Sequence, residues 1–203
     1  EDQKAIYVLT GPSRSHLENS PYLEAFKARG YEVAFFTDHG DEFVLDSLSS
    51  VDGKPVTMID RADVELPELE EEQKDALPRE EAAALEEWMK ELYPDKFSKV
   101  TLGKRLVSGA AVALQSGNDM GAEMRAYMKA MGQEIPESHP QLELNPSNPL
   151  VKKLSALRTE NPELAQMVAD QIANTALLRA DMLDDPAVLA QSSQTLMEQL
   201  LLK

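Results

Sequence analysis

The sequence predicts an α/β fold, α+β overall, in which a small three-layer αβα unit is followed by a mixed α+β unit that ends in a pair of helices. Unalternating apolar runs separated by helical segments fill the first third of the chain, which is typical of a parallel sheet covered on both faces. A second group of strands follows, and the C-terminal part carries helical periodicity only. We expect the two units to occupy residues 1–95 and 96–203.

The first unit is expected to alternate strands with helices. Its elements, in order, are a strand at 6–9, a helix at 22–28, a strand at 33–36, a helix at 41–48, a strand at 56–59 and a helix at 79–92. The turn Asp52-Gly53-Lys54-Pro55 introduces the third strand. Residues 63–75 contain seven acids and one base, which is typical of a solvated linker.

The second unit is expected to contain three strands and a helical end. The strands are expected at 100–102, 110–114 and 141–144, and the helices at 149–158, 162–179 and 186–202. Asn161 and Asp185 are good N-cap residues, and a proline follows each at the first helical position.

The charge balance excludes two classes of partner. The 203 residues include 36 acids and 20 bases, so the formal net charge is −16. Nucleic acid and anionic membranes would be repelled by such a surface, and we expect neither as a partner. No apolar run approaches the roughly 20 residues of a membrane span. The first strand begins almost at the N-terminus, so we expect the chain to be a fragment cut at a domain boundary.

A search for catalytic motifs is largely negative. The three histidines are scattered, there is no cysteine, and neither a phosphate-binding glycine loop nor a Gly-x-Ser-x-Gly elbow occurs. We therefore expect no metal site and no enzymatic activity in this chain. One rival function stays open, a small-molecule or nucleotide-binding α/β domain that uses the crevice beyond the strand ends, near residues 10–14 and 38–42.

A methionine stripe lies in the segment expected to form an amphipathic helix near 119–131. Its members follow helical spacing: Met120, Met124, Tyr127, Met128 and Met131. One interpretation is an ordinary core helix within a structural module. The other is an exposed surface, since flexible, polarizable methionine suits contact with varied apolar partners.

The last two helices carry apolar residues that need a partner surface. On the first helix these include Leu164, Val168, Ile172 and Leu178, and on the second the coiled-coil seam Leu189, Ser193, Leu196 and Leu200. A second copy of the chain could complete a four-helix bundle in a homodimer. Packing within one chain, or a purely structural dimerisation module, is the alternative.

Eight short segments carry a likeness to a known family. They are Tyr22-Leu23-Glu24-Ala25-Phe26, Gly30-Tyr31-Glu32-Val33, Thr37-Asp38-His39-Gly40-Asp41-Glu42, Asp52-Gly53-Lys54, Arg105-Leu106-Val107-Ser108-Gly109-Ala110, Leu142-Glu143-Leu144-Asn145-Pro146, Thr175-Ala176-Leu177-Leu178 and Leu183-Asp184-Asp185-Pro186. In this order they resemble the heat shock protein 90 family of stress-response chaperones, in particular the bacterial HtpG type. The resemblance implies the end of the middle domain followed by the C-terminal dimerisation domain.

The resemblance also implies a function and a site. It implies a cytoplasmic chaperone that forms a homodimer and binds unfolded or partly folded clients. It places client contacts at Glu42, Phe43, Asp46, Met120, Met124, Tyr127 and Met128. ATP and magnesium would bind in an N-terminal ATPase domain that this chain does not contain, so no cofactor is expected here.

Overall fold

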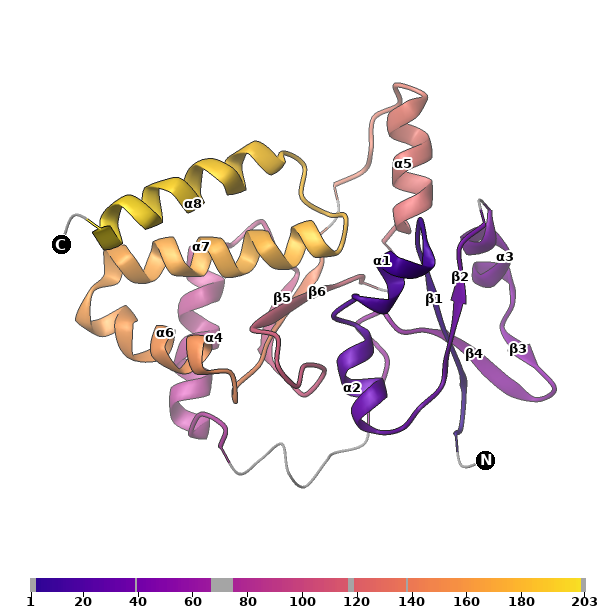
Figure 1. The fold of residues 1–203 in the computed structure, drawn as a ribbon, viewed down its shortest axis with the longest axis horizontal. Helices are drawn as coiled ribbons and strands as arrows, with labels where there is room; N and C mark the ends of the chain where they lie inside the picture. Colours follow the sequence, from indigo (N-terminus) through magenta and orange to yellow (C-terminus); the bar gives the residue numbers. More distant parts are fainter. Residues whose placement is uncertain (1–2, 39, 67–74, 117–118, 138, 202–203) are drawn as a thin grey trace.

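The computed structural model describes residues 3–38, 40–66, 75–116, 119–137 and 139–201 (Figure 1). Most of the acidic segment 63–75, expected to be a linker, lies outside these ranges. Within them the elements are β1 (Ile6–Thr10), α1 (Arg14–Glu18), α2 (Leu23–Ala28), β2 (Val33–Phe36), α3 (Asp41–Ser47), β3 (Ser50–Val51), β4 (Lys54–Met58), α4 (Arg79–Leu92), β5 (Lys99–Leu102), β6 (Ala111–Leu114), α5 (Ala122–Ala130), β7 (Gln141–Leu144), α6 (Pro149–Glu160), α7 (Pro162–Arg179) and α8 (Pro186–Leu201).

The first sheet has the strand order β2-β1-β4-β3. Strand β1 pairs in parallel with β2 and with β4, which confirms the expected parallel arrangement. The short β3 was not predicted. It pairs antiparallel with β4 in a hairpin whose turn residues, Asp52 and Gly53, both have positive φ, as Asp-Gly does in tight hairpin turns.

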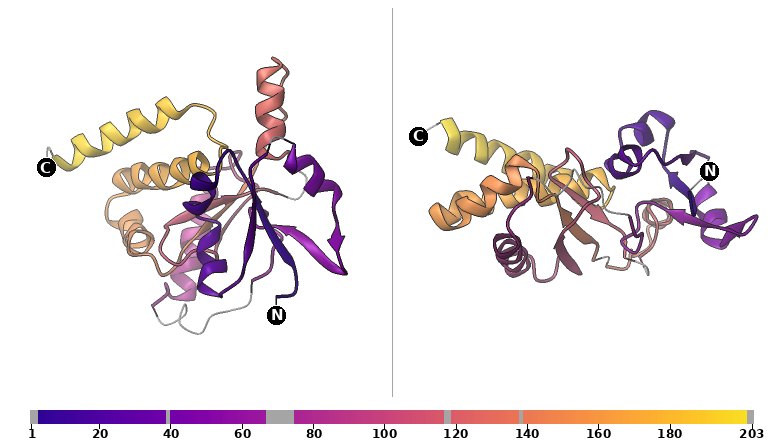
Figure 2. Two further views of the ribbon diagram at one scale, coloured as in Figure 1. Left: turned by 45° about the vertical axis from the view of Figure 1, so that its right-hand side comes forward. Right: turned by 90° about the horizontal axis from the view of Figure 1, so that it is seen from below.

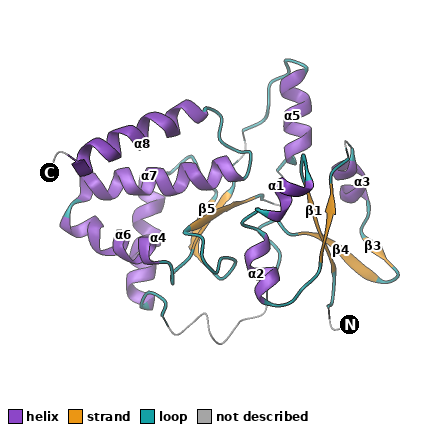
Figure 3. Cartoon of the chain, viewed as in Figure 1, coloured by secondary structure: helices purple, strands orange, loops and turns teal. Residues whose placement is uncertain are grey.

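Helices cover both faces of this sheet, so the expected three layers are present (Figure 3). On one face Leu45 of α3 packs with Val8 and Met58. On the other face Leu17 of α1 and Phe26 of α2 join the main hydrophobic core. The short helix α1 was not predicted. Its N-cap is Ser13, whose side chain accepts a hydrogen bond from the backbone N–H of His16.

The second sheet has the order β5-β7-β6, with β7 parallel to β5 and antiparallel to β6. Helix α4 packs beside β5 and α6, and α7 packs beside β6. The helix expected to close the first unit thus lies with the second sheet, through the fully buried Leu85 and Met89. The boundary at residues 95 and 96 stays a prediction, and this packing favours a division before α4.

The two sheets share one core and a hydrogen-bonded junction. The Tyr22 hydroxyl donates to the carbonyl of Ala113 over 2.7 Å. The buried Arg105 guanidinium donates to three backbone carbonyls that follow β4, those of Ile59, Ala62 and Val64. This junction holds the two sheets in a fixed relation, so it also positions the loops at their edges.

Glu24 of α2 contributes a carboxylate to the same junction. One of its oxygens accepts hydrogen bonds from the backbone N–H groups of Val107, Ser108 and Gly109, at 2.8, 2.8 and 3.1 Å. Partial burial raises the pKa of Glu24, but these hydrogen bonds lower it more, so its pKa lies below the ordinary value.

We expect the Glu24→Gln variant to melt a few degrees below the parent chain near neutral pH. The folded-state pKa is depressed, so the charged carboxylate stabilises the fold above the unfolded-state pKa of about 4.3. This contribution is lost as the pH falls through the lower folded-state pKa. The melting temperatures of the parent chain and of Glu24→Gln should therefore converge as the pH is lowered from about 7 to about 3. Glu91→Gln, at an exposed position on α4, is the control, and a Glu24→Gln difference independent of pH would contradict this account.

Helix α8 lies along α7 at the C-terminal end of the chain (Figures 1 and 2). The side chain of Gln171 bonds with the hydroxyls of Ser192 and Ser193, which fixes one face of α8 against α7. No residue of α8 is buried. None of the helices in the described ranges has the length and apolar composition needed to cross a bilayer.

Candidate functional site

Two of the predicted clusters meet in space although about 75 residues separate them in the sequence. Residues of helix α3, of the segment that leads into α5 and of α5 itself line a small open cavity of about 220 Å³. Its lining consists of Glu42, Phe43, Asp46, Asp119, Met120, Gly121 and Met124. Five of these seven residues were predicted from the sequence. We call this set, with Tyr127 and Met128, the α3–α5 surface.

Glu42 connects the two helices. It is only 3 % exposed, and a Cβ atom at Gly121 would overlap its carboxylate. Gly121 is the N-cap of α5, so the Glu42 carboxylate lies at the positive end of the α5 dipole. A side chain at position 121 would therefore displace the Glu42 carboxylate from its buried position. Glu42 is thus packed between α3 and the start of α5, with little surface left for a client.

Asp46 is half exposed, and it forms an ion pair with an arginine that the sequence did not indicate as its partner. Its Oδ1 accepts a hydrogen bond from Nη2 of Arg61 at 2.5 Å. Arg61 follows β4, and its backbone pairs with that of Gln115, at the end of β6, in an isolated parallel β-bridge. The negative charge of Asp46 is therefore compensated within the chain, and the polar edge of the α3–α5 surface includes an arginine.

The methionine stripe lies outside both hydrophobic cores formed by the described residues. Tyr127 is 58 % exposed, while Met120, Met124 and Met128 are half-buried. Helix α5 is shorter than the expected 119–131, and Met120 precedes it. Figures 1 and 2 show α5 projecting away from the two sheets. The interpretation of the stripe as part of a core helix is therefore wrong for the single chain.

Two neighbouring apolar side chains of α3 are exposed. Phe43 is 43 % exposed and Val44 is 64 % exposed, because Leu45 alone anchors the middle of α3 to the sheet. Phe43, which was predicted as a site residue, lines both cavities, whereas Val44 lines neither. The exposure of Val44 follows from helical spacing, since it cannot share the face of Leu45.

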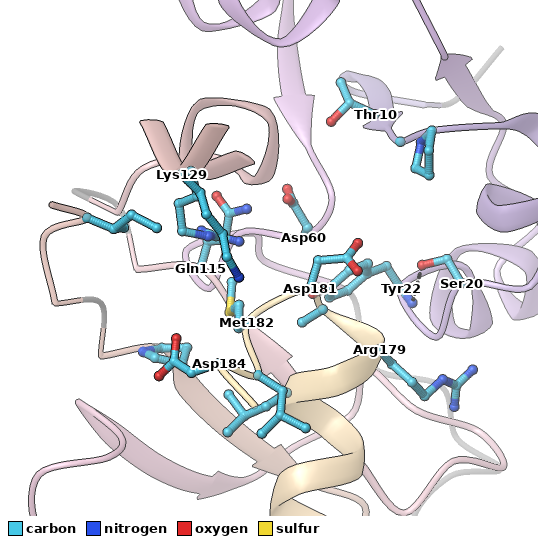
Figure 4. A pocket seen from close by; sticks show the side chains of 18 of the residues that line it. Thr10, Ser20, Tyr22, Asp60, Gln115, Lys129, Arg179, Asp181, Met182 and Asp184 are labelled. Atoms are coloured by element: carbon cyan, nitrogen blue, oxygen red, sulfur yellow. Dashed lines mark hydrogen bonds between the residues drawn. The ribbon is translucent and has the colours of Figure 1, made fainter. Parts of the chain in front are cut away.

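A second, larger cavity of about 1510 Å³ adjoins this surface (Figure 4). Its wall includes the turn after β1, the loop between α7 and α8, and parts of α5. Phe43 and Tyr127 contribute to it too, so the cavity and the α3–α5 surface are continuous. Thr10, Gly11 and Pro12, proposed for a small-molecule crevice, lie in this wall. The described residues contain no group of three side chains placed to hold a metal ion.

The residues predicted for a dimer interface fall into three groups. Leu178 and Leu200 are exposed, at 41 % and 63 %. The half-buried members are Leu164, Val168, Leu189, Ser193 and Leu196. Ile172 is 5 % exposed and belongs to the core of the single chain, because that face of α7 packs beside β6. Ile172 is therefore not accessible to a second copy of the chain, and its prediction as an interface residue is wrong.

The seam residues of α8 are also partly used within the chain. The Ser193 hydroxyl donates to the side chain of Gln171, so the face that carries Leu189 and Leu196 is directed toward α7. The strongly exposed apolar residues of α8 are Val188, Met197, Leu200 and Leu201. Val188, Met197 and Leu201 lie off the predicted seam, because a heptad seam selects only one face of the helix.

Comparisons with known proteins agree on a family. The Hsp90 protein family model matches residues 1–202. The chaperone protein HtpG of Geobacter sulfurreducens is 38 % identical over 186 residues, which cover 88 % of this chain and 28 % of that protein. HtpG of Burkholderia cenocepacia is 35 % identical over 198 residues, covering 97 % of this chain and 31 % of the relative. The chain thus spans about three-tenths of the length of these relatives. It belongs to the Hsp90 family of molecular chaperones.

Proposed function

We propose that this chain is the client-binding and dimerisation part of an ATP-dependent chaperone that assists protein folding. The observation that carries the proposal is the α3–α5 surface, where one cavity unites residues of two distant sequence segments. An aromatic ring and flexible methionines can repack around apolar side chains of differing shape. Such a surface suits unfolded segments, which expose apolar residues in no fixed arrangement.

Charge supports the same function. A net charge of −16 keeps a protein with exposed apolar side chains soluble, and it favours basic clients over nucleic acid and anionic membranes. We propose that the whole protein works in the cytoplasm as a homodimer, with α7 and α8 of two copies forming a four-helix bundle. The exposed Leu178 and Leu200 support this arrangement.

The ATPase activity of the whole protein is proposed to reside in an N-terminal domain outside this chain, which would hold ATP and magnesium. In this chain we expect neither hydrolysis nor specific binding of ATP. Calorimetry with MgATP should give no saturable heat, and stoichiometric binding would revive a nucleotide-binding α/β domain as the function.

Binding of an unfolded protein tests the proposed function directly. The probe is fluorescently labelled ribonuclease A that has been reduced and carboxamidomethylated, a basic chain that cannot refold. We expect saturable binding to the 203-residue chain by fluorescence anisotropy, and none to native ribonuclease A. This binding should not require ATP. Equal binding of native and unfolded ribonuclease A would show charge attraction only and would refute client recognition.

A further inference from the structure

Three buried polar side chains lie together in the wall of the larger cavity. Asp60, Gln115 and Arg125 are 7 %, 4 % and 9 % exposed. One atom of each, Oδ1 of Asp60, Oε1 of Gln115 and Nη2 of Arg125, has no hydrogen-bond partner among the described residues. Buried polar atoms are almost always paired, so these three atoms are unused hydrogen-bonding groups in residues that line one cavity. The atoms themselves have almost no accessible surface, so a ligand in the cavity reaches them when their side chains turn toward it.

The backbone brings these side chains together. The backbone N–H of Gln115 donates to the carbonyl of Asp60 over 3.0 Å, which places the two residues next to each other (Figure 4). Arg125 comes from α5, and its Nη1 donates to the carbonyl of Met120. The guanidinium is therefore held by the segment that also forms the α3–α5 surface, while Nη2 is left for another acceptor.

The chemistry of the three atoms defines the ligand. An amide oxygen and a carboxyl oxygen accept hydrogen bonds, and a guanidinium N–H donates one. Burial raises the pKa of Asp60 above its ordinary value, and the charges of Arg61 and Arg125 offset only part of that rise. The charge of Arg125 disfavours a cationic ligand, and the unpaired oxygens of Asp60 and Gln115 offer no donor to an anionic one. Neutral peptide groups offer both kinds of partner: the N–H groups of two of them can donate to the two oxygens, and the C=O of one can accept from Arg125.

We infer that this polar part of the cavity binds backbone peptide groups of a client segment whose apolar side chains lie on the α3–α5 surface. The inference rests on the proposed function and deepens it. Phe43 and Tyr127 line the cavity, so one extended segment can reach both. Recognition of the peptide group does not depend on sequence. It distinguishes unfolded chains, whose backbone groups are free, from folded proteins, whose backbone groups are paired.

The test uses two peptides that differ only in their backbone. One is a capped, labelled eleven-residue peptide of Leu, Val, Ala and Phe with a Lys at each end. The other has every second peptide bond replaced by an ester, which removes the N–H and weakens the carbonyl as acceptor. We expect the parent chain to bind the amide peptide about 10-fold more tightly, as the loss of one or two hydrogen bonds predicts.

The Gln115→Met variant removes one unpaired acceptor at nearly constant side-chain volume. We expect the preference for the amide peptide to fall below about 3-fold, while the melting temperature stays the same or rises, because an unsatisfied buried group is lost. Arg125→Met removes the donor and should reduce the preference in the same way. The control is Lys129→Met, an exposed residue in the same cavity wall, which should leave the preference unchanged.

Phe43→Ala separates this inference from the proposed function, since it should weaken both peptides equally. Equal binding of the amide and ester peptides to the parent chain would overturn the inference and leave the proposed function standing. An undiminished preference in folded Gln115→Met and Arg125→Met would also overturn it. Failure of the parent chain to bind either peptide would overturn both.

Discussion

Replacing Met124 and Met128 together by alanine is expected to weaken the binding of unfolded ribonuclease A by about 30-fold or more, because clustered apolar anchors contribute most of an interface's binding free energy. The free energy of unfolding should fall by only about 1 kcal/mol or less, since neither side chain belongs to a hydrophobic core. Anisotropy titrations and urea denaturation of the same preparations measure the two effects.

Met89→Ala is the matched comparison, because the same atoms are removed from a fully buried position on α4. It should cost about 2–5 kcal/mol in stability and leave the affinity of the folded protein for the client unchanged. The opposite pattern, in which the pair Met124 and Met128 controls stability and not binding, would show that α5 is a structural helix. The client surface would then have to be sought elsewhere.

The Leu200→Glu variant is expected to convert a dimer to a folded monomer. Leu200 is 63 % exposed in the single chain, so the substitution should change the protomer's stability by about 0.5 kcal/mol or less. In a four-helix bundle the same change would place a charge in an apolar interface twice, once from each copy. We expect the dissociation constant of the dimer to rise by at least about 100-fold.

Sedimentation velocity at micromolar concentration distinguishes the two states. Gln194→Glu adds the same charge at another exposed position of α8 and should leave the dimer intact. A Leu200→Glu protein that sediments as the parent dimer would exclude this part of α8 from the interface.

The elements that the sequence predicted best are those with local signals. Helix α7 begins at the expected residue because Asn161 caps it and Pro162 fixes its first turn. Strand β2 was predicted at its observed bounds from a continuous apolar run. The short β3 was missed because two residues carry no periodicity, and its pairing depends on the conformation of the Asp52-Gly53 turn.

The features that the sequence did not predict depend on tertiary contacts. No local pattern shows that α4 packs with the second sheet or that Ile172 lies in the core of the single chain, because one apolar stripe suits either partner. The contact between Glu42 and Gly121 joins residues far apart in sequence. Asp60 and Gln115 are isolated polar residues in sequence, and only the adjacent ends of β4 and β6 bring them together.

A double-mutant cycle between Phe43 and Met124 tests most directly whether α3 and α5 form one client site. The affinities for unfolded ribonuclease A are measured for the parent chain, Phe43→Ala, Met124→Ala and the double variant. Because both side chains line one cavity, we predict a coupling free energy of about 0.5–3 kcal/mol. Additivity of the two single effects within about 0.3 kcal/mol would show that the two helices act separately and would contradict a shared site.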